Sequence, residues 1–303
     1  MQRQMKSAQH HWWPRCVSKN WADEEGFTTW ITPDGTCKRI PPAKLGMIGN
    51  GHHIKLSPNL SEDSPFDMSF ESIFDRADSN FPALIDWLST LERKEVTNNE
   101  LKNRFIPEVA TDDQLRLFTE CVVSLAIRSP MNREASVAVA ENYRGKLPPQ
   151  ERNALIGLNM KNSLRMIADS IGNSAKFAVL FSKNKEFIFG DGFFNNVAGC
   201  TNPPHAPKAL VSITPMMSVI ISRPTSYRTE PRVSTLVLSD SEVDNCNHGV
   251  QIYSRAALFF RNDQPELTED FTCGQHRRYS SSANPLDTLI DSLSGMEIRR
   301  HFF

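Results

Sequence analysis

The chain has 303 residues, of which 39% are hydrophobic and 23% charged, a composition typical of a globular protein rather than a disordered one. Its 34 lysines and arginines balance 35 aspartates and glutamates, and the formal net charge of -1 argues against a protein that binds polyanions through its overall charge.

Neither a membrane span nor a secretory signal is predicted. The apolar stretches stop well short of the roughly 20 residues that a membrane helix needs, and no apolar segment follows the basic start of the chain. The six cysteines include no Cys-x-x-Cys pair. We therefore expect reduced thiols, a cytoplasmic location and no membrane partner.

Residues 1–66 form the first section, in which a β-hairpin is predicted. Residues 27–32 and 36–40 are rich in β-branched and aromatic side chains and flank the sequence Pro33-Asp34-Gly35. Proline and glycine favour a tight turn there, and Pro41 with Pro42 should end the second strand.

The second section, residues 67–172, is predicted to be helical. Apolar side chains recur every three or four positions over residues 68–91, where Pro82 should kink or divide the helix. A second helix starts after the cap at Thr111 and ends at Ser129-Pro130. Two more helices are expected to stop at glycines: residues 132–143 before Gly145, and residues 148–171 before Gly172.

The third section, residues 173–303, has a different periodicity. Residues 177–181 and 186–191 are predicted to be strands joined by a polar turn, and residues 210–222 one or two buried strands bent at Pro215. A helix capped at Ser239 is expected from residue 243 to about residue 260. An irregular tail should follow over residues 262–282, and a short amphipathic helix is expected within residues 285–303. We predict one α+β domain over residues 1–303, its helical middle packed on a small mixed sheet from the hairpin region and the C-terminal third.

Five segments in this order resemble a family of bacterial proteins, domain of unknown function 4238. Its members begin with His-Tyr-hydrophobic-Pro and later carry Arg-Thr-Pro-x-x-Arg, Phe-Ile-Thr-Ser-Asp-Asn-Pro, Pro-Leu-Ser-Pro and a late helix with an Asn before an Ala-Ala pair. The matching segments here are His10 to Pro14, Ala126 to Arg133, Glu186 to Gly192, Ser212 to Pro215 and Val243 to Ala257.

The resemblance implies a biological context rather than a reaction, since members occur as single-gene systems against phage and have no settled activity. One departure concerns the turn after the second predicted strand. Members carry Asp-Asn-Pro where this chain has Asp191-Gly192-Phe193, which puts in doubt any binding geometry of that turn.

Two histidine pairs are candidates for chemistry. His10 or His11 could serve as a general base or metal ligand, and on extended backbone only one of them faces a given site; alternatively, they belong to a strand edge anchored by Trp12 and Trp13. A second pair, residues 52–53, follows a Gly-Asn-Gly turn in a spacing loosely similar to His-Asn-His nucleases; a solvated loop is the alternative.

Acidic candidates come from two elements. Glu71, Asp75 and Asp78 share one face of the predicted helix, where a metal, Arg76 or an arginine of another segment would offset their repulsion. Asp191 follows an apolar strand and precedes a glycine, a position suited to metal or substrate contact but also common in turns.

Arg128 and Arg133 flank the predicted helix end at Ser129-Pro130. They could bind a phosphate, since guanidinium groups bind anions with two hydrogen bonds. Alternatively, Arg128 caps its helix or forms a buried ion pair with Asp191 that joins helix to sheet.

Together these residues predict an anti-phage effector that acts on nucleic acid or nucleotide phosphate as a metal-dependent phosphodiesterase or nuclease using Mg or Mn. The alternative is a non-catalytic sensor or adaptor that binds a phage protein or other phage component. In the enzyme hypothesis, His10 or His11 is the general base. Glu71 and Asp191 hold the metal or a water, and Arg128 and Arg133 contact the phosphate.

Overall fold

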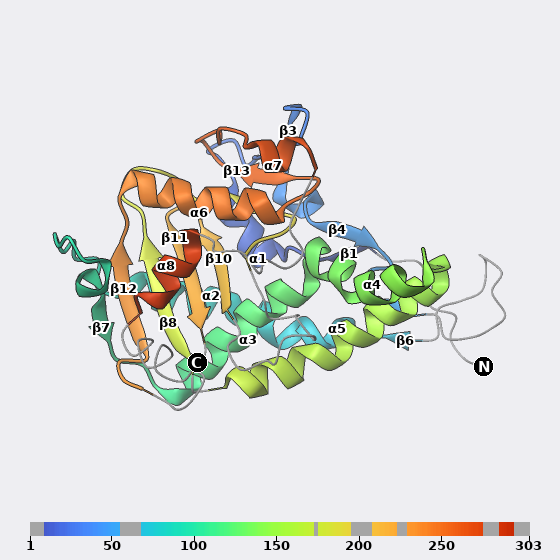
Figure 1. Cartoon of the computed structure of the whole chain (residues 1–303), viewed down its shortest axis with the longest axis horizontal. Helices are drawn as coiled ribbons and strands as arrows, with labels where there is room; N and C mark the ends of the chain where they lie inside the picture. Colours follow the sequence, from blue (N-terminus) through green and yellow to red (C-terminus); the bar gives the residue numbers. More distant parts are fainter. Residues whose placement is uncertain are drawn as a thin grey trace.

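The computed structural model describes residues 9–54, 68–172, 175–194, 208–222, 229–274 and 285–293. A five-stranded sheet lies at its centre (Figure 1). Neighbouring strands are antiparallel except β8 and β12, which run parallel. The strands, in spatial order, are β10 (Lys208–Thr214), β11 (Met217–Ser222), β8 (Lys176–Phe181), β12 (Val233–Val237) and β7 (Ile106–Glu108).

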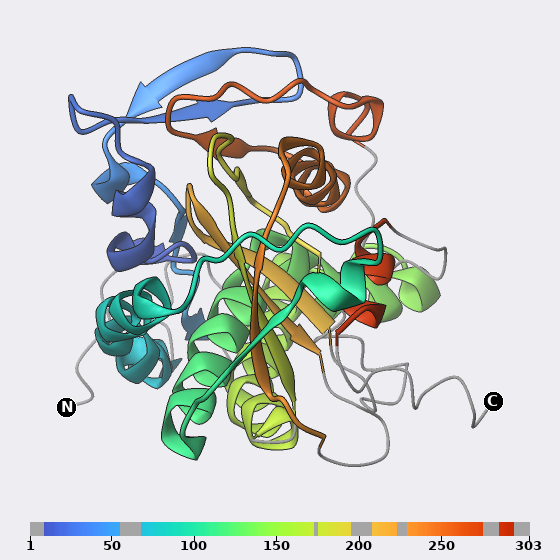
Figure 2. The same cartoon turned by 90° about the vertical axis from the view of Figure 1, so that its left-hand side faces the viewer.

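Helices cover both faces of this sheet because its strands are apolar on both sides. On β11, Val219 and Ile221 face a core shared with α2, α3 and α5, whereas Ile220 faces a second core shared with α6 and α8. Figures 1 and 2 show the resulting layers. The helices are α2 (Asp75–Thr90), α3 (Asp112–Arg128), α5 (Pro149–Ile171), α6 (Asp240–Tyr253) and α8 (Pro285–Asp291). The α+β fold class is confirmed.

A second sheet of four strands lies beside α6 at one end of the molecule (Figure 2). It contains the predicted hairpin, whose two strands pair in antiparallel fashion across the Pro-Asp-Gly turn. Its order is β3 (Cys37–Ile40), β2 (Thr28–Ile31), β13 (Leu258–Phe260) and β9 (Phe189–Gly190). The N-terminal hairpin and two strands of the C-terminal third therefore share this sheet. The central sheet takes four of its five strands from the C-terminal third and none from the hairpin, so the single shared sheet that the sequence predicted is wrong.

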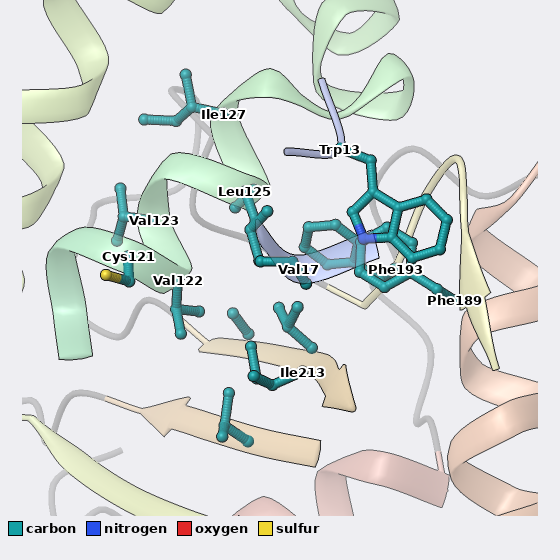
Figure 3. Close-up of a cluster of buried hydrophobic side chains, with 14 of the residues drawn as sticks. Trp13, Val17, Cys121, Val122, Val123, Leu125, Ile127, Phe189, Phe193 and Ile213 are labelled. Carbon is teal, nitrogen blue, oxygen red and sulfur yellow. The ribbon is translucent and has the colours of Figure 1, made fainter. Parts of the chain in front are cut away.

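The first segment of the chain is anchored by aromatic packing. β1 (Gln9–His11) pairs with β4 (Met47–Gly49), and α1 (Arg15–Ser18) follows directly. Between them, the buried Trp13 stacks on Phe189 with 4.3 Å between ring centroids, and Phe193 lies beside this pair (Figure 3). This packing holds β1 against the second sheet.

The helix predicted over residues 68–91 is shorter than expected. Residues 68–69 form strand β6, which pairs with β5 (His53–Ile54), and residues 71–74 form a 3₁₀ turn before α2 begins. Pro82 lies inside α2 without dividing it. Phe81 before the proline and Leu84 and Leu88 after it are buried, so tertiary packing stabilises both halves of the helix.

The other predicted helices of the middle section are confirmed. Thr111 and Gln114 form a reciprocal cap at the start of α3, and Ser129 ends α3 and caps α4 (Pro130–Arg144). Gly145 and Gly172 follow α4 and α5, as expected.

Two predictions for the last section are wrong. The strands near residues 177–181 and 186–191 do not form a hairpin, because β8 and β9 lie in different sheets. The helix predicted to about Phe260 ends at Tyr253, and β13 follows it; the apolar run 257–260 pairs with β2 and β9 instead of extending the helix. A short helix, α7 (Glu269–Thr272), interrupts the predicted tail, and residues 294–303 lie outside the described residues.

Candidate metal centre

His10, His52 and Glu71 converge from three segments. One carboxylate oxygen of Glu71, Oε2, lies 2.7 Å from Nδ1 of His52 and 3.1 Å from Nε2 of His10. The metal-ligating atoms of the three side chains lie within 4.8 Å of one another. Both imidazoles are buried, whereas the Glu71 side chain is 48% exposed, so the carboxylate closes the cluster on its solvent side.

Local structure explains how the three side chains meet. His10 lies on β1 opposite Ile48, so the turn that follows β4 returns the chain to its side. Asn50 adopts a φ of 54° in that turn, which asparagine tolerates better than most residues. The carbonyl of His52 then accepts a hydrogen bond of 3.0 Å from the amide of Phe70, which places Glu71 next to the histidines.

Helix α5 closes the rear of the cluster. A Cβ atom on Gly157 would lie 2.5 Å from Cγ1 of Ile54, so glycine allows the helix to approach β5 this closely. The ring of His52 also packs against Phe70 and Phe74, with centroid distances of 5.5 and 4.8 Å. The histidines therefore have an apolar rear wall.

This environment keeps the histidines neutral. Burial lowers the pKa of His10 to about 4, although the charge of Glu71 acts in the opposite direction. Burial also lowers the pKa of His52 and outweighs its hydrogen bond to Glu71. For Glu71, burial acts to raise the pKa, but the hydrogen bond from His52 and the nearby positive charges leave it below its usual value. The expected state is an ionised carboxylate with two neutral imidazoles.

A backbone hydrogen bond defines the tautomer of His10. The amide of His52 donates to Nδ1 of His10 at 3.2 Å, so the proton of the neutral ring lies on Nε2 and points to Glu71. A metal ion at Nε2 would displace this proton to Nδ1, where the amide now donates. Metal binding at His10 therefore requires the His52 amide to give up this acceptor.

His11 and His53, which follow His10 and His52 in the chain, have different surroundings. Nε2 of His11 lies 3.4 Å from the carbonyl oxygen of Ala43 in an exposed position, and no described contact connects His11 with Glu71. This agrees with the expectation that only one of two adjacent imidazoles faces a given site. His53 packs edge-on against His10 with 4.4 Å between ring centroids.

Arg128 contacts an acid of α2 rather than the centre or Asp191. It donates two hydrogen bonds to the carboxylate of Asp78, at 2.7 and 3.0 Å, and its guanidinium lies over the ring of Phe74. The predicted carboxylate face of α2 is thus answered at Asp78 by an arginine of another segment, while Arg76 pairs with Glu120. Asp75 is exposed.

Asp191 lies apart from the metal centre and is held by backbone amides. Its carboxylate oxygens accept hydrogen bonds from the amides of Arg255 and Ala256 at 2.8 and 3.0 Å. Burial raises the pKa of Asp191, although these N–H groups act in the opposite direction. No contact of the described residues joins Asp191 to Glu71 or to a histidine, so it is not one of the three clustered ligands.

The backbone at Gly192 leaves no room for a side chain. A Cβ atom at Gly192 would lie 1.9 Å from the carbonyl oxygen of Tyr253. The asparagine of the family pattern therefore does not fit this backbone.

Of the candidate residues, the structure brings His10 and Glu71 together and adds His52. The sequence offered a signal for His52 in its histidine pair after a glycine-rich turn, but the spacing alone did not favour it over a solvated loop. The deciding contact joins residues 42 positions apart in the chain, from the amide of His52 to the ring of His10.

No family model, curated protein or solved structure matches this chain. The resemblance to domain of unknown function 4238 therefore stays a prediction. Among the described residues, no helix is both long and apolar enough to cross a membrane.

Proposed function

We propose that the chain is a metal-dependent hydrolase that cleaves phosphate esters of nucleic acids or nucleotides, with the metal ion held by His10, His52 and Glu71. The convergence of two buried imidazoles on one half-exposed carboxylate carries this proposal. Two histidines and a glutamate form a known catalytic zinc set, in which the fourth position remains open for water or substrate.

The ligand types favour a transition metal over magnesium. Imidazole nitrogen suits zinc, copper, iron and nickel, whereas magnesium and manganese prefer carboxylate, carbonyl and water oxygens. We therefore favour Zn²⁺ over the Mg²⁺ or Mn²⁺ that the sequence alone left open. Such an ion would lower the pKa of a bound water and so supply a nucleophile at neutral pH.

The charge near the centre favours an anionic substrate. Arg128 and Arg133 both act to lower the pKa of His52, so both lie within electrostatic reach of the cluster. Asp78 balances the charge of Arg128, which leaves Arg133 as the positive charge that a substrate would meet. A dication would also offset the charge of Glu71. A phosphate ester meets a positive potential there.

Metal binding tests the proposal most directly. We expect the purified protein to bind about one equivalent of Zn²⁺ in calorimetry. Glu71→Gln should weaken this binding at least about 100-fold, because it removes a charged ligand, while His11→Asn should not change it. Equal affinity in the wild type and Glu71→Gln would overturn the metal site.

The metal-bound protein should then hydrolyse single-stranded or double-stranded DNA, RNA or nucleotides, with Glu71→Gln inactive and His11→Asn active. Metal binding without hydrolysis of any of these would favour the alternative of a non-catalytic sensor or adaptor.

The tautomer of His10 gives a readout of metal binding that is independent of activity. Nitrogen-15 spectra of the imidazoles should show the proton of His10 on Nε2 in metal-free protein and on Nδ1 after zinc is added. An unchanged tautomer in zinc-saturated protein would show that His10 is not a ligand.

A role in phage defence rests on the family resemblance alone and needs its own test. Cells that express the wild-type chain should resist phages that infect cells expressing Glu71→Gln, with the two proteins present at equal amounts. Equal resistance in both would separate defence from the metal centre.

A further inference from the structure

A cavity of about 200 Å³ lies beside the metal centre, where the first turn of α4 approaches β4 and the loop after α6. Figure 1 shows α4 next to β4. Its wall combines four apolar residues with two arginines and two acids: Ile48, Pro130, Met131, Tyr253, Arg133, Arg255, Glu134 and Asp191.

Arg133 connects this cavity to the metal centre. Its Nη1 donates to the carbonyl of Gly51 at 2.9 Å, and the next residue is His52. The same nitrogen lies 3.2 Å from the sulfur of Met160. Among the residues that the structure describes, no hydrogen bond engages Nε or Nη2, and no carboxylate pairs with this guanidinium.

Arg133 is partly buried, and burial lowers its pKa to about 10, although the charge of nearby Glu134 acts in the opposite direction. Because Arg133 lines the cavity, its remaining N–H groups can reach a bound molecule there. An anion there would supply a countercharge to Arg133, because Glu134 is hydrogen-bonded to Arg152.

Arg255 supplies a second positive charge from the loop after α6. Its side chain makes no hydrogen bond or ion pair with any described residue, and it is exposed. Its backbone is held, because its amide donates to the carboxylate of Asp191. The guanidinium thus extends from a fixed backbone position at the rim of the cavity.

The two acids of the wall already have partners. Glu134 accepts a hydrogen bond of 2.5 Å from Arg152. Asp191 accepts from two backbone amides, and burial makes its charged form less favourable than that of an ordinary aspartate. The arginines therefore dominate the charge that a ligand meets.

We propose that this cavity binds the terminal phosphate of a nucleotide or a nucleic-acid strand, held between Arg133 and Arg255. The inference rests on the proposed function, since it gives that site its substrate class. Two guanidiniums match the double negative charge of a phosphate monoester, whereas a carboxylate balances only one. The volume is below the roughly 300 Å³ at which pockets for whole drug-sized ligands begin, so it fits a strand end and not a duplex.

Calorimetry of the metal-free protein in EDTA tests the subsite without the metal. Adenosine 5′-monophosphate and inorganic phosphate should bind, while adenosine and acetate should not. Arg255→Ala should weaken monophosphate binding at least tenfold, and Arg133→Lys should weaken it while retaining the charge. Arg165→Ala, which removes an exposed arginine of α5, should leave it unchanged.

Equal monophosphate affinity in the wild type and Arg255→Ala would overturn the subsite, and so would binding of adenosine as tight as that of the monophosphate. Acetate binding as tight as that of phosphate would identify a carboxylate site and overturn the assignment as well.

Zinc binding separates this inference from the function on which it rests. Zinc binding without monophosphate binding removes the subsite and leaves the metal centre intact. Monophosphate binding without zinc binding does the reverse. As a further readout, a linear single strand with a terminal phosphate should be degraded faster than a circular strand of the same sequence.

Discussion

Arg128 and Arg133 lie five positions apart, at the end of α3 and the start of α4, yet their surroundings differ sharply. Arg128 is 1% exposed and makes two hydrogen bonds with Asp78. Arg133 donates only to a backbone carbonyl and a thioether, and lines a cavity. The first charge is balanced within the protein, and the second is not.

This difference separates a structural role from a binding role. A bidentate ion pair between α3 and α2 fixes the two helices behind the metal centre, whereas an unbalanced guanidinium suits an external anion. The sequence predicted that both arginines contact a phosphate, with a helix cap or an ion pair with Asp191 as the alternatives for Arg128. In the structure, Arg128 pairs with Asp78 and so has a structural role.

The largest effect should follow from removing the acid that balances Arg128. Asp78→Asn leaves a buried guanidinium without a countercharge, and we expect the free energy of unfolding to fall by about 3 kcal/mol in urea denaturation. This is the lower end for a buried pair, because the Asp78 side chain is 35% exposed.

The matched variant is Arg128→Met, which removes the buried charge and leaves the more exposed acid. It should cost less stability than Asp78→Asn. If Asp78→Asn were as stable as the wild type, the ion pair between Arg128 and Asp78 would not stabilise the fold. The difference in role between Arg128 and Arg133 would then be wrong.

In the metal-free protein, the free energy of unfolding should change by about 2 kcal/mol with pH, because burial keeps His10 neutral in the folded chain. The unfolded chain takes up a proton on His10 near pH 6.5, but the folded chain resists it until about pH 4. The free energy of unfolding should therefore fall as pH drops through this window.

His10→Asn isolates this contribution, since asparagine retains an acceptor for the amide of His52 while it cannot gain a proton. The difference between the wild type and this variant should shrink or reverse from pH 7 to 4.5. A difference independent of pH would mean that His10 has the same pKa in the folded and the unfolded chain. A difference that grows as pH falls would mean that folded His10 is charged and pairs with Glu71 as Arg128 does with Asp78.

The parts of the structure that the sequence predicted are those that short-range signals determine. Caps such as Thr111, the Pro-Asp-Gly turn and the glycines after α4 and α5 act within a few residues, so they identified the helices and the hairpin. Sheet membership depends on distant pairing, and residues 189–190 could not be assigned to the strand at 258–260 from local pattern alone.

The candidate site shows the same limit. His10 and Glu71 were identified as individual residues with suitable chemistry, but which acid Arg128 meets depends on how α2 packs on α3. Asp78 on a helix and Asp191 at a strand end were both suitable acids, and no short-range signal shows which of them pairs with Arg128.

The smallest expected effect is the most direct test of the contrast between the two arginines. Arg133→Met removes a partly buried charge to which no described acid is hydrogen-bonded, which favours the folded state, and also removes the donor to the carbonyl of Gly51, which disfavours it. We expect these contributions to cancel to within about 1 kcal/mol of the wild-type free energy of unfolding. A loss comparable to that of Asp78→Asn would show that Arg133 is as structural as Arg128, whereas near-equal stability, combined with lost binding of adenosine 5′-monophosphate, would show that its charge is retained for a ligand.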